Sequence, residues 1–465
     1  MNIRNLLTAI PWLVALSGAI AVASLLQGTA PVELHFRLPV ETIEQAAETQ
    51  QVVDLHGTLE TFGGQPSSLP GAWPGFRGPS RDGISTGTID LALNWPESGP
   101  PKLWELELGE GYAGAAVLNG RVYVHDYDHE AEAEIIRCVS LDDGREIWRY
   151  SYNVHIRRNH GMSRTIPAVT DKYLVAMGAL CHVTCLDSQT GERRWAIDLQ
   201  TEYGTRVPPW YTGQCPLIDG GFAILAPGGD DVLMMAVDCE TGEIVWERPN
   251  DTNWQMSHSS IVKMDLNGRE TYVYAASGGV VGVDASDGAL LWGTSEWRIS
   301  MATVPTPVIV DNERIFLSGG YNAGSLMIRI VESDGKYSVE ELFRLPARVF
   351  GAEQQTPILH GGHIYGVSSP GGELVCLDLD GNRLWSSGRA DRFGLGPFVM
   401  AGGKMLLLDD SGVLTLAGVS PQGFNRLARA GVLNGNEAWG PMAVASGRLI
   451  VRNLTTMVCL DITGE

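Results

Sequence analysis

The chain has 465 residues, of which 44% are hydrophobic, and its 54 acidic residues outnumber its 33 basic residues to give a formal net charge of −21. This length and hydrophobic content are sufficient for a well-buried globular core. A surface this negative repels nucleic acid and anionic lipid headgroups, so we expect neither of them as a partner.

Residues 1–27 predict a segment directed to the membrane. Residues 6–26 are an uncharged run preceded by Arg4. As a helix, a run of this length spans about 30 Å, the thickness of the hydrocarbon core of a bilayer. We expect an uncleaved signal anchor that attaches the chain to the inner membrane, with everything after it in the periplasm. The alternative is a cleaved signal peptide, because residues 21–23 are small enough for a cleavage site, and the protein would then be periplasmic or secreted.

Two short segments separate this run from the repeats. Residues 28–72 predict a linker, since they lack strand alternation and include the turn-forming sequence GGQPSSLPG at 63–71. Residues 73–100 predict a lead-in that opens with WPGFRGPSRDG. We expect Trp73 and Phe76 to pack on the following domain, because apolar residues among Gly and Pro more often anchor a loop than bind a ligand.

A hairpin motif recurs through residues 101–465, and its clearest copy is LDSQTGERRW at 186–195. An apolar residue and an Asp end one strand, a turn containing Gly reverses the chain, and an aromatic residue lies in the return strand. The equivalent positions are Trp104, Trp148, Trp195, Trp246, Trp292, Phe343, Trp385 and Leu427. They are 42 to 51 residues apart, which is room for four short strands.

Four-stranded units at this spacing predict a β-propeller. A second repeated element, an apolar strand that usually begins at Pro and is followed by a turn and another apolar strand, recurs in the same frame, as in IPAVTDKYLVAMG at 166–178. Eight copies of each element predict an all-β fold of eight four-stranded blades. The chain ends at the turn of VCLDITGE (458–465), and PKLWELELG (101–109) is the strand that this copy lacks. We therefore expect the N-terminal strand to complete the last blade and to remove an open sheet edge.

The repeat resembles the pyrroloquinoline quinone (PQQ)-like repeat propellers, a family that includes quinoprotein alcohol dehydrogenases and the BamB-type outer-membrane assembly lipoproteins. The lead-in resembles that of secreted propeller proteins of planctomycete-type bacteria. The resemblance implies the fold more strongly than an activity, because one propeller scaffold carries both enzymes and binding modules. The first cysteine is Cys138, so the lipid anchor of the BamB-type proteins is not expected.

For an enzyme of this family, the resemblance implies PQQ on the ring axis, with two adjacent cysteines, a stacking Trp, Ca²⁺ bound by Glu and Asn, and an Asp base. None of the seven cysteines is adjacent to another, and the short blades leave little room for long pocket loops. We therefore expect no cofactor and no metal. A PQQ-dependent oxidoreductase with Ca²⁺ remains the alternative.

We expect function at one mouth of the central channel, where the loops that lead into the innermost strands come together. The candidate ligand-binding residues in these loops are His160, Arg164, Trp210, Tyr211, Gln214, His258, Gln355, Glu437 and Trp439. Aromatic rings beside amide, imidazole and guanidinium groups suit a protein, peptide or glycan partner. The alternative is that the rings pack neighbouring loops and the polar groups bind channel water.

These patterns predict a membrane-tethered, monomeric binding or scaffolding propeller rather than an enzyme. A hydrolase is a further alternative, since His160 and Ser163 are close in the sequence. That alternative lacks a placed acid and an oxyanion site, and we assign no catalytic residue.

The N-terminal run gives the first testable prediction. An uncleaved anchor should hold the full-length chain in the membrane fraction, with the propeller open to protease added from the periplasmic side, because Arg4 keeps the N-terminus inside. A cytoplasmic protein that stays intact under the same treatment is the control. A mature chain that begins at Ser24 and is released by osmotic shock would show instead that the run is a cleaved signal.

Overall fold

A computed structural model describes residues 53–369 and 371–464, and all of these belong to one compact unit, Thr49–Glu465. The predicted anchor at 6–26 lies outside the described residues. Within the described ranges, no helix is long and apolar enough to cross a membrane.

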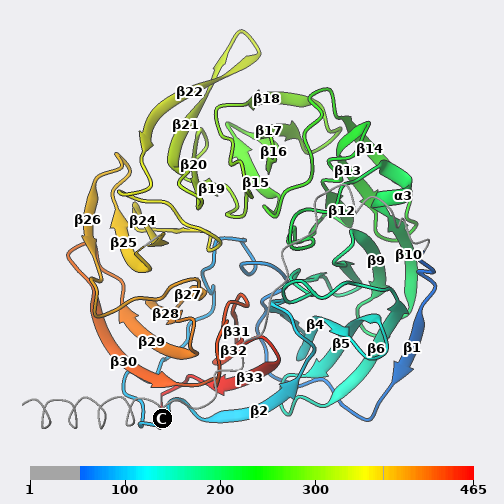
Figure 1. Ribbon diagram of the computed structural model, residues 1–465, viewed down its shortest axis with the longest axis vertical. Coiled ribbons are helices and arrows are strands. Elements are labelled where there is room, and N and C mark those ends of the chain that lie inside the picture. The colour runs from blue at the N-terminus through cyan, green and yellow to red at the C-terminus, as the bar shows by residue number, and fades with distance from the viewer. Residues whose placement is uncertain (1–52, 370, 465) are drawn as a thin grey trace, which may run out of the picture. The chain divides into compact units, whose positions relative to one another are not determined.

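The described residues form eight antiparallel sheets arranged in a ring (Figure 1). Blades 1 to 4 contain the strands β3 (Ala115–Leu118), β4 (Arg121–Asp128), β5 (Ala133–Ser140), β6 (Glu146–Asn153), β7 (Ala168–Val169), β8 (Tyr173–Met177), β9 (His182–Asp187), β10 (Arg193–Asp198), β11 (Leu217–Asp219), β12 (Phe222–Leu225), β13 (Val232–Asp238), β14 (Ile244–Pro249), β15 (Val262–Leu266), β16 (Arg269–Ala276), β17 (Gly279–Asp284) and β18 (Leu290–Thr294). Blades 5 to 8 contain β19 (Val308–Ile309), β20 (Arg314–Gly319), β21 (Gly324–Ser333), β22 (Lys336–Leu345), β23 (Ile358–His360), β24 (His363–Ser368), β25 (Glu373–Leu377), β26 (Arg383–Ser386), β27 (Phe398–Ala401), β28 (Lys404–Leu408), β29 (Val413–Gly418), β30 (Asn425–Gly431), β31 (Ala443–Ala445), β32 (Arg448–Arg452) and β33 (Thr456–Asp461). A short helix, α3 (Leu199–Tyr203), follows β10. The predicted all-β, eight-bladed architecture is confirmed.

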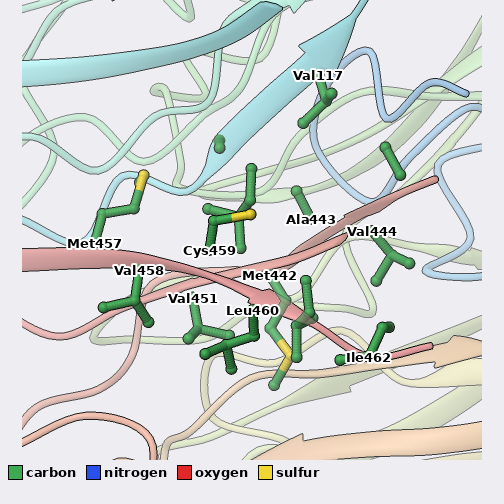
Figure 2. Packing of buried hydrophobic residues seen from close by; sticks show 14 of the residues in the cluster. Val117, Met442, Ala443, Val444, Val451, Met457, Val458, Cys459, Leu460 and Ile462 are labelled. Atoms are coloured by element: carbon green, nitrogen blue, oxygen red, sulfur yellow. The ribbon is translucent and has the colours of Figure 1, made fainter. Parts of the chain in front are cut away.

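Blade 8 is assembled from both ends of the propeller. The strand β2 (Lys102–Glu107) pairs with β33, and Trp104 lies opposite Cys459. A buried cluster extends from this blade into both neighbours (Figure 2), and it includes Val117 of blade 1, Val451 of blade 8 and Leu406 of blade 7. The predicted closure by the N-terminal strand is therefore present, and the ring has no free edge between its first and last blades.

The repeated aromatic residues lie in the outermost strands, and several of them dock their blade on the next one. The Trp104 indole packs on Gly144 of blade 1, and its Nε1 donates to the Leu141 carbonyl at 2.9 Å. A Cβ on Gly144 would lie 3.0 Å from the ring, and the φ of this residue is +71°, so both the close approach and the backbone favour Gly. Trp195 repeats this geometry one blade further on, where its Nε1 donates to the Cys239 carbonyl.

Blade 5 departs from this docking arrangement. Its outer strands β21 and β22 are each ten residues long and form a hairpin that projects from the ring (Figure 1). Gly335 at the tip of this hairpin has open space where a Cβ would lie, so Trp292 of blade 4 does not stack on it. Because this hairpin is longer than the others, its turn lies too far from blade 4 for Trp292 to contact it.

The segment predicted as a linker contains a strand, β1 (Thr58–Thr61), which pairs with β6 as a fifth strand of blade 1. All four residues of β1 are exposed. A strand that covers the rim of a sheet has no buried face, so the sequence TLET shows no apolar alternation. The linker prediction for residues 28–72 missed this element for that reason.

The lead-in runs through the middle of the ring, where Figure 1 shows it as a blue segment inside the blades. Trp73 and Val117 exchange two backbone hydrogen bonds, and Ile84 forms a bridge with Met400 of blade 7. Arg77 donates to the Thr356 and Pro357 carbonyls of blade 6. The lead-in thus binds opposite sides of the channel and forms a floor across it.

Replacement of Trp104 tests the docking of blade 8 on blade 1. Trp104→Ala should lower the free energy of unfolding by about 3–5 kcal/mol, because it leaves a cavity at a nearly buried ring and an unpaired Leu141 carbonyl. Leu103→Ala on the same strand is the matched control, since Leu103 is 38% exposed and should cost little. Equal melting temperatures for the two variants would contradict the docking role.

Candidate functional site

A cavity of about 180 Å³ lies between the lead-in floor and one mouth of the channel. The loops that lead into the innermost strands, called here the mouth loops, are residues 108–114, 154–167, 199–216, 250–261, 295–307, 346–357, 387–397 and 432–442. Trp73, Phe76 and Arg77 of the lead-in line the cavity floor. On the other side of the lead-in, Ser67 donates to the Gly120 carbonyl in the turn after β3. The cavity is therefore a blind cup that faces the mouth loops.

Two groups of stacked rings flank the cavity. Tyr112 and Trp439 stack with their centroids 5.2 Å apart. Trp210 lies between His258 and Tyr321, at 6.4 Å from each, and is nearly parallel to Tyr321. All five rings line the cavity, so a ligand that enters it meets aromatic side chains on two sides.

Several residues around the mouth have a left-handed backbone that is rare outside Gly. The φ angles are +61° for Trp210, +74° for Tyr211, +53° for Tyr321 and +64° for Glu437. Each such conformation costs on the order of 1–3 kcal/mol for a non-Gly residue. Strain of this kind persists only where the surrounding structure holds it, and two of these residues, Trp210 and Tyr321, line the cavity.

Arg164 supplies a positive charge in the cavity wall. Its Nε donates to the Trp210 carbonyl, and its guanidinium lies 4.9 Å from the centroid of the Tyr112 ring. Burial lowers the pKa of Arg164 to about 10, so the side chain stays charged at neutral pH. Tyr112 in turn donates from its hydroxyl to Glu437 at 2.7 Å, and burial together with this bond raises the pKa of Tyr112.

His258 is neutral and has one nitrogen without a partner. Burial, reinforced by the Arg164 charge, lowers the pKa of His258 to about 4. The ring bonds to the backbone of Pro209, which has only a carbonyl to offer, and Nε2 has no partner among the described residues. The donor is therefore Nδ1, and Nε2 carries a lone pair that can accept a hydrogen bond.

The lining residues carry an unusual charge for this protein. Arg77 and Arg164 line the cavity, while none of the lining residues in the described chain is an Asp or a Glu. The nearby acids are engaged outside it, since Glu437 accepts from Tyr112 and Asp410 accepts from Trp439 Nε1 at 2.8 Å. In a chain with a net charge of −21, the described side chains that line the cavity therefore include two positive charges and no negative one.

The structure brings five of the nine sequence-predicted residues together at the cavity: Arg164, Trp210, His258, Gln355 and Trp439. The other four do not line it. His160 packs edge-on against Trp210, Tyr211 donates its hydroxyl to the Arg157 carbonyl, and Glu437 bonds Tyr112. Gln214 is fully buried between blades 3 and 4, where its amide bonds Ala226 and Tyr274.

Sequence reasoning missed Tyr112, Tyr321 and the floor residues. Tyr112 lies in the first mouth loop, 108–114, and its place in the repeat frame was the available signal. Tyr321 lies in the hairpin turn between β20 and β21, outside the loops that lead into the innermost strands. Nothing in the lead-in sequence indicates that Arg77 enters the channel.

Comparisons with known proteins agree on the fold. The family model described as outer membrane protein assembly factor BamB matches residues 131–387, more than half of the chain. BamB from Moraxella catarrhalis is similar, with a TM-score of 0.52 and 17% identity over 78% of this chain and 99% of that chain. A quinohemoprotein alcohol dehydrogenase from Pseudomonas putida HK5 is similar, with a TM-score of 0.61 and 12% identity over 85% of this chain and 81% of that chain. No curated protein sequence matches the chain.

The lining residues do not fit PQQ with Ca²⁺. Rings suitable for stacking are present, but the described lining offers no Glu, Asp or Asn for the ion or the base, and Cys215 has no adjacent cysteine. The hydrolase alternative also lacks geometry, because the Ser163 hydroxyl is buried against Gly111 without a partner among the described residues.

The buried neutral His258 predicts a pH dependence of stability. In the unfolded chain it takes up a proton near pH 6.5, whereas in the folded chain it does so only near pH 4. Stability contributed by this group is therefore complete above about pH 6.5 and falls as the pH drops towards 4, by about 3 kcal/mol in total. His258→Asn, whose amide can still donate to Pro209, should remove this part of the pH dependence in urea unfolding. A difference between wild type and variant that stays constant from pH 7 to pH 4 would contradict the assignment.

Proposed function

The chain belongs to the family of the outer membrane protein assembly factor BamB, and from this membership we propose that it is a binding or scaffolding propeller that recognises its partner at the channel mouth. The single observation that carries the proposal is the blind cavity lined by stacked rings and by polar groups with free bonding capacity. Catalysis needs a placed acid, base or nucleophile, whereas binding needs only shape, flat faces and unsatisfied polar atoms.

The strained rim supports this proposal. Trp210 and Tyr321 both have positive φ and stack on each other, so the backbone strain sustains the orientation of a ring pair at the opening. Packing alone would not require it, because a rotamer of a relaxed residue can fill a loop at lower cost. We infer that the rings are held for contact with a partner.

The partner class follows from the lining. Aromatic faces stack on the rings of a sugar or on the side chains of a peptide, and the Arg164 and His258 nitrogens supply a donor and an acceptor. We propose a protein, peptide or glycan partner. We also propose that the protein acts as a monomer, that residues 6–26 tether it to the membrane, and that the propeller lies in the periplasm. The hydrophobic run before the propeller is the support for this location.

The first experiment identifies the partner. Protein purified from its native host would be searched by mass spectrometry for bound glycan, peptide or protein, and by absorbance for quinone. A bound quinone would contradict the binding proposal and favour the oxidoreductase.

Replacement of the cavity rings tests the position of the site. Trp210→Ala and Trp439→Ala should each weaken binding of the identified partner by about 1–3 kcal/mol, because each removes a stacked, partly desolvated ring. Phe222→Ala is the matched control, since this ring is 36% exposed on a strand start away from the cavity. Unchanged affinity in the double variant, at an unchanged melting temperature, would move the site away from the mouth.

A further inference from the structure

The electrostatics of the cavity distinguish between ligands of different charge. Arg77 in the floor and Arg164 in the wall both line the cavity, and the described lining contains no acidic side chain, although Asp82 and Glu437 lie close enough to act on the charges of Arg77 and Arg164 respectively. The low-dielectric walls between these charges concentrate their field. A neutral ligand would gain no binding energy from this field, and a cationic ligand would be repelled by it.

The two arginines play different parts. Every nitrogen of the Arg77 guanidinium is bonded, to the carbonyls of Arg81, Asp82, Thr356 and Pro357. Arg77 therefore contributes charge and holds the floor in place. Arg164 is committed only through Nε, and no described residue accepts a hydrogen bond from its two terminal nitrogens. These two terminal nitrogens lie in one plane, and their N–H groups can donate in parallel to the two oxygens of a carboxylate; we call them the Arg164 fork.

His258 adds a hydrogen-bond acceptor to the donors of Arg164. Its side chain is more than nine-tenths buried, it lines the same cavity, and its Nε2 lone pair has no partner among the described residues. A buried acceptor without a donor is costly, so a ligand N–H or O–H that reaches Nε2 is favoured there. A ligand that bonds both Arg164 and His258 carries an anionic group and a hydrogen-bond donor close together.

The remaining lining favours a sugar over a peptide main chain. Peptide recognition commonly uses free backbone groups or amides, but the Gln354 and Gln355 amides already bond the carbonyls of Leu395, Gly394 and Gly396. Sugar rings present flat C–H faces to aromatic rings and hydroxyls to polar groups. The cavity volume of about 180 Å³ is also below the roughly 300–1,000 Å³ of pockets that enclose larger ligands, so a single ring unit enters.

We propose that the cavity binds the uronate unit of an acidic glycan, with the carboxylate on the Arg164 fork, a ring hydroxyl donating to His258 Nε2, and the sugar ring in contact with the aromatic side chains that line the cavity. This inference rests on the proposed function and specifies its ligand.

Calorimetry with matched probes tests it. The full chain would be titrated at low salt with trigalacturonic acid, with its methyl ester, and with penta-alanine as the free acid. The acid should bind about 10- to 100-fold more tightly than the ester, because the ester removes a charge-assisted hydrogen bond without a change in ring shape. Arg164→Gln should abolish the difference between acid and ester, and Arg164→Lys should restore part of it, since Lys keeps the charge without the fork. Arg145→Gln, at a highly exposed position, is the matched control.

The outcomes separate this inference from the proposed function. Equal binding of acid and ester, lost in the Trp210→Ala/Trp439→Ala double variant, would overturn the uronate assignment and leave the mouth as the binding site. Preference for penta-alanine would overturn it in favour of a peptide carboxylate. Failure of all three probes on wild-type protein would overturn it as well, while the mouth itself is judged by the partner purified from the host. The comparison of acid with ester uses unaltered protein, so it does not depend on the folding of any variant.

Discussion

The propeller depends on a contact that repeats from blade to blade, an indole laid on a glycine that has no side chain. Trp104 on Gly144 and Trp195 on Gly242 are two examples, each with a hydrogen bond from the indole to a carbonyl of the same turn. Where it is present, the contact couples the outer strand of one blade to the hairpin of the next. Within the described residues, it is absent between blades 4 and 5, where Gly335 has open space around it, and the strand β2 provides it at the closure between blades 8 and 1.

The site is a consequence of a second constraint, the filling of the ring axis. Eight blades leave an axial space, and the lead-in occupies one part of it. Arg77 and Arg81 attach the lead-in through carbonyls of blades 6 and 3, which uses charged side chains as donors rather than as ion-pair partners. Burial lowers the pKa of both residues to about 10, which still leaves them charged at neutral pH. The floor of the cavity is therefore positive for a structural reason, and Arg164 adds to that charge from the wall.

Much of the architecture was predictable because the same motif recurs, so a strand that is unclear in one copy can be recognised from the others. The period of positions such as Trp148 and Trp385 predicted the number of blades, and the unfinished motif at 458–465 predicted the closure. Elements that do not recur along the chain were harder to predict. The strand β1 is exposed along its whole length and carries no periodic signal, and the route of Arg77 into the channel is set by tertiary contacts. Gln214 has a loop position in the sequence, but its side chain is buried between blades 3 and 4, where its amide bonds Ala226 and Tyr274.

The lead-in also has a consequence for the order in which the molecule is built. It is synthesised before any blade, yet the carbonyl that accepts from Arg77 at Thr356 lies 279 residues further along the chain. Contacts of such large sequence separation form late, because a long loop must close before they are made. The blades must therefore assemble around a lead-in that is synthesised before most of the residues it will contact. A chain truncated before blade 6 would leave Arg77 without these acceptors, so the cup can exist only after nearly the whole ring has been made.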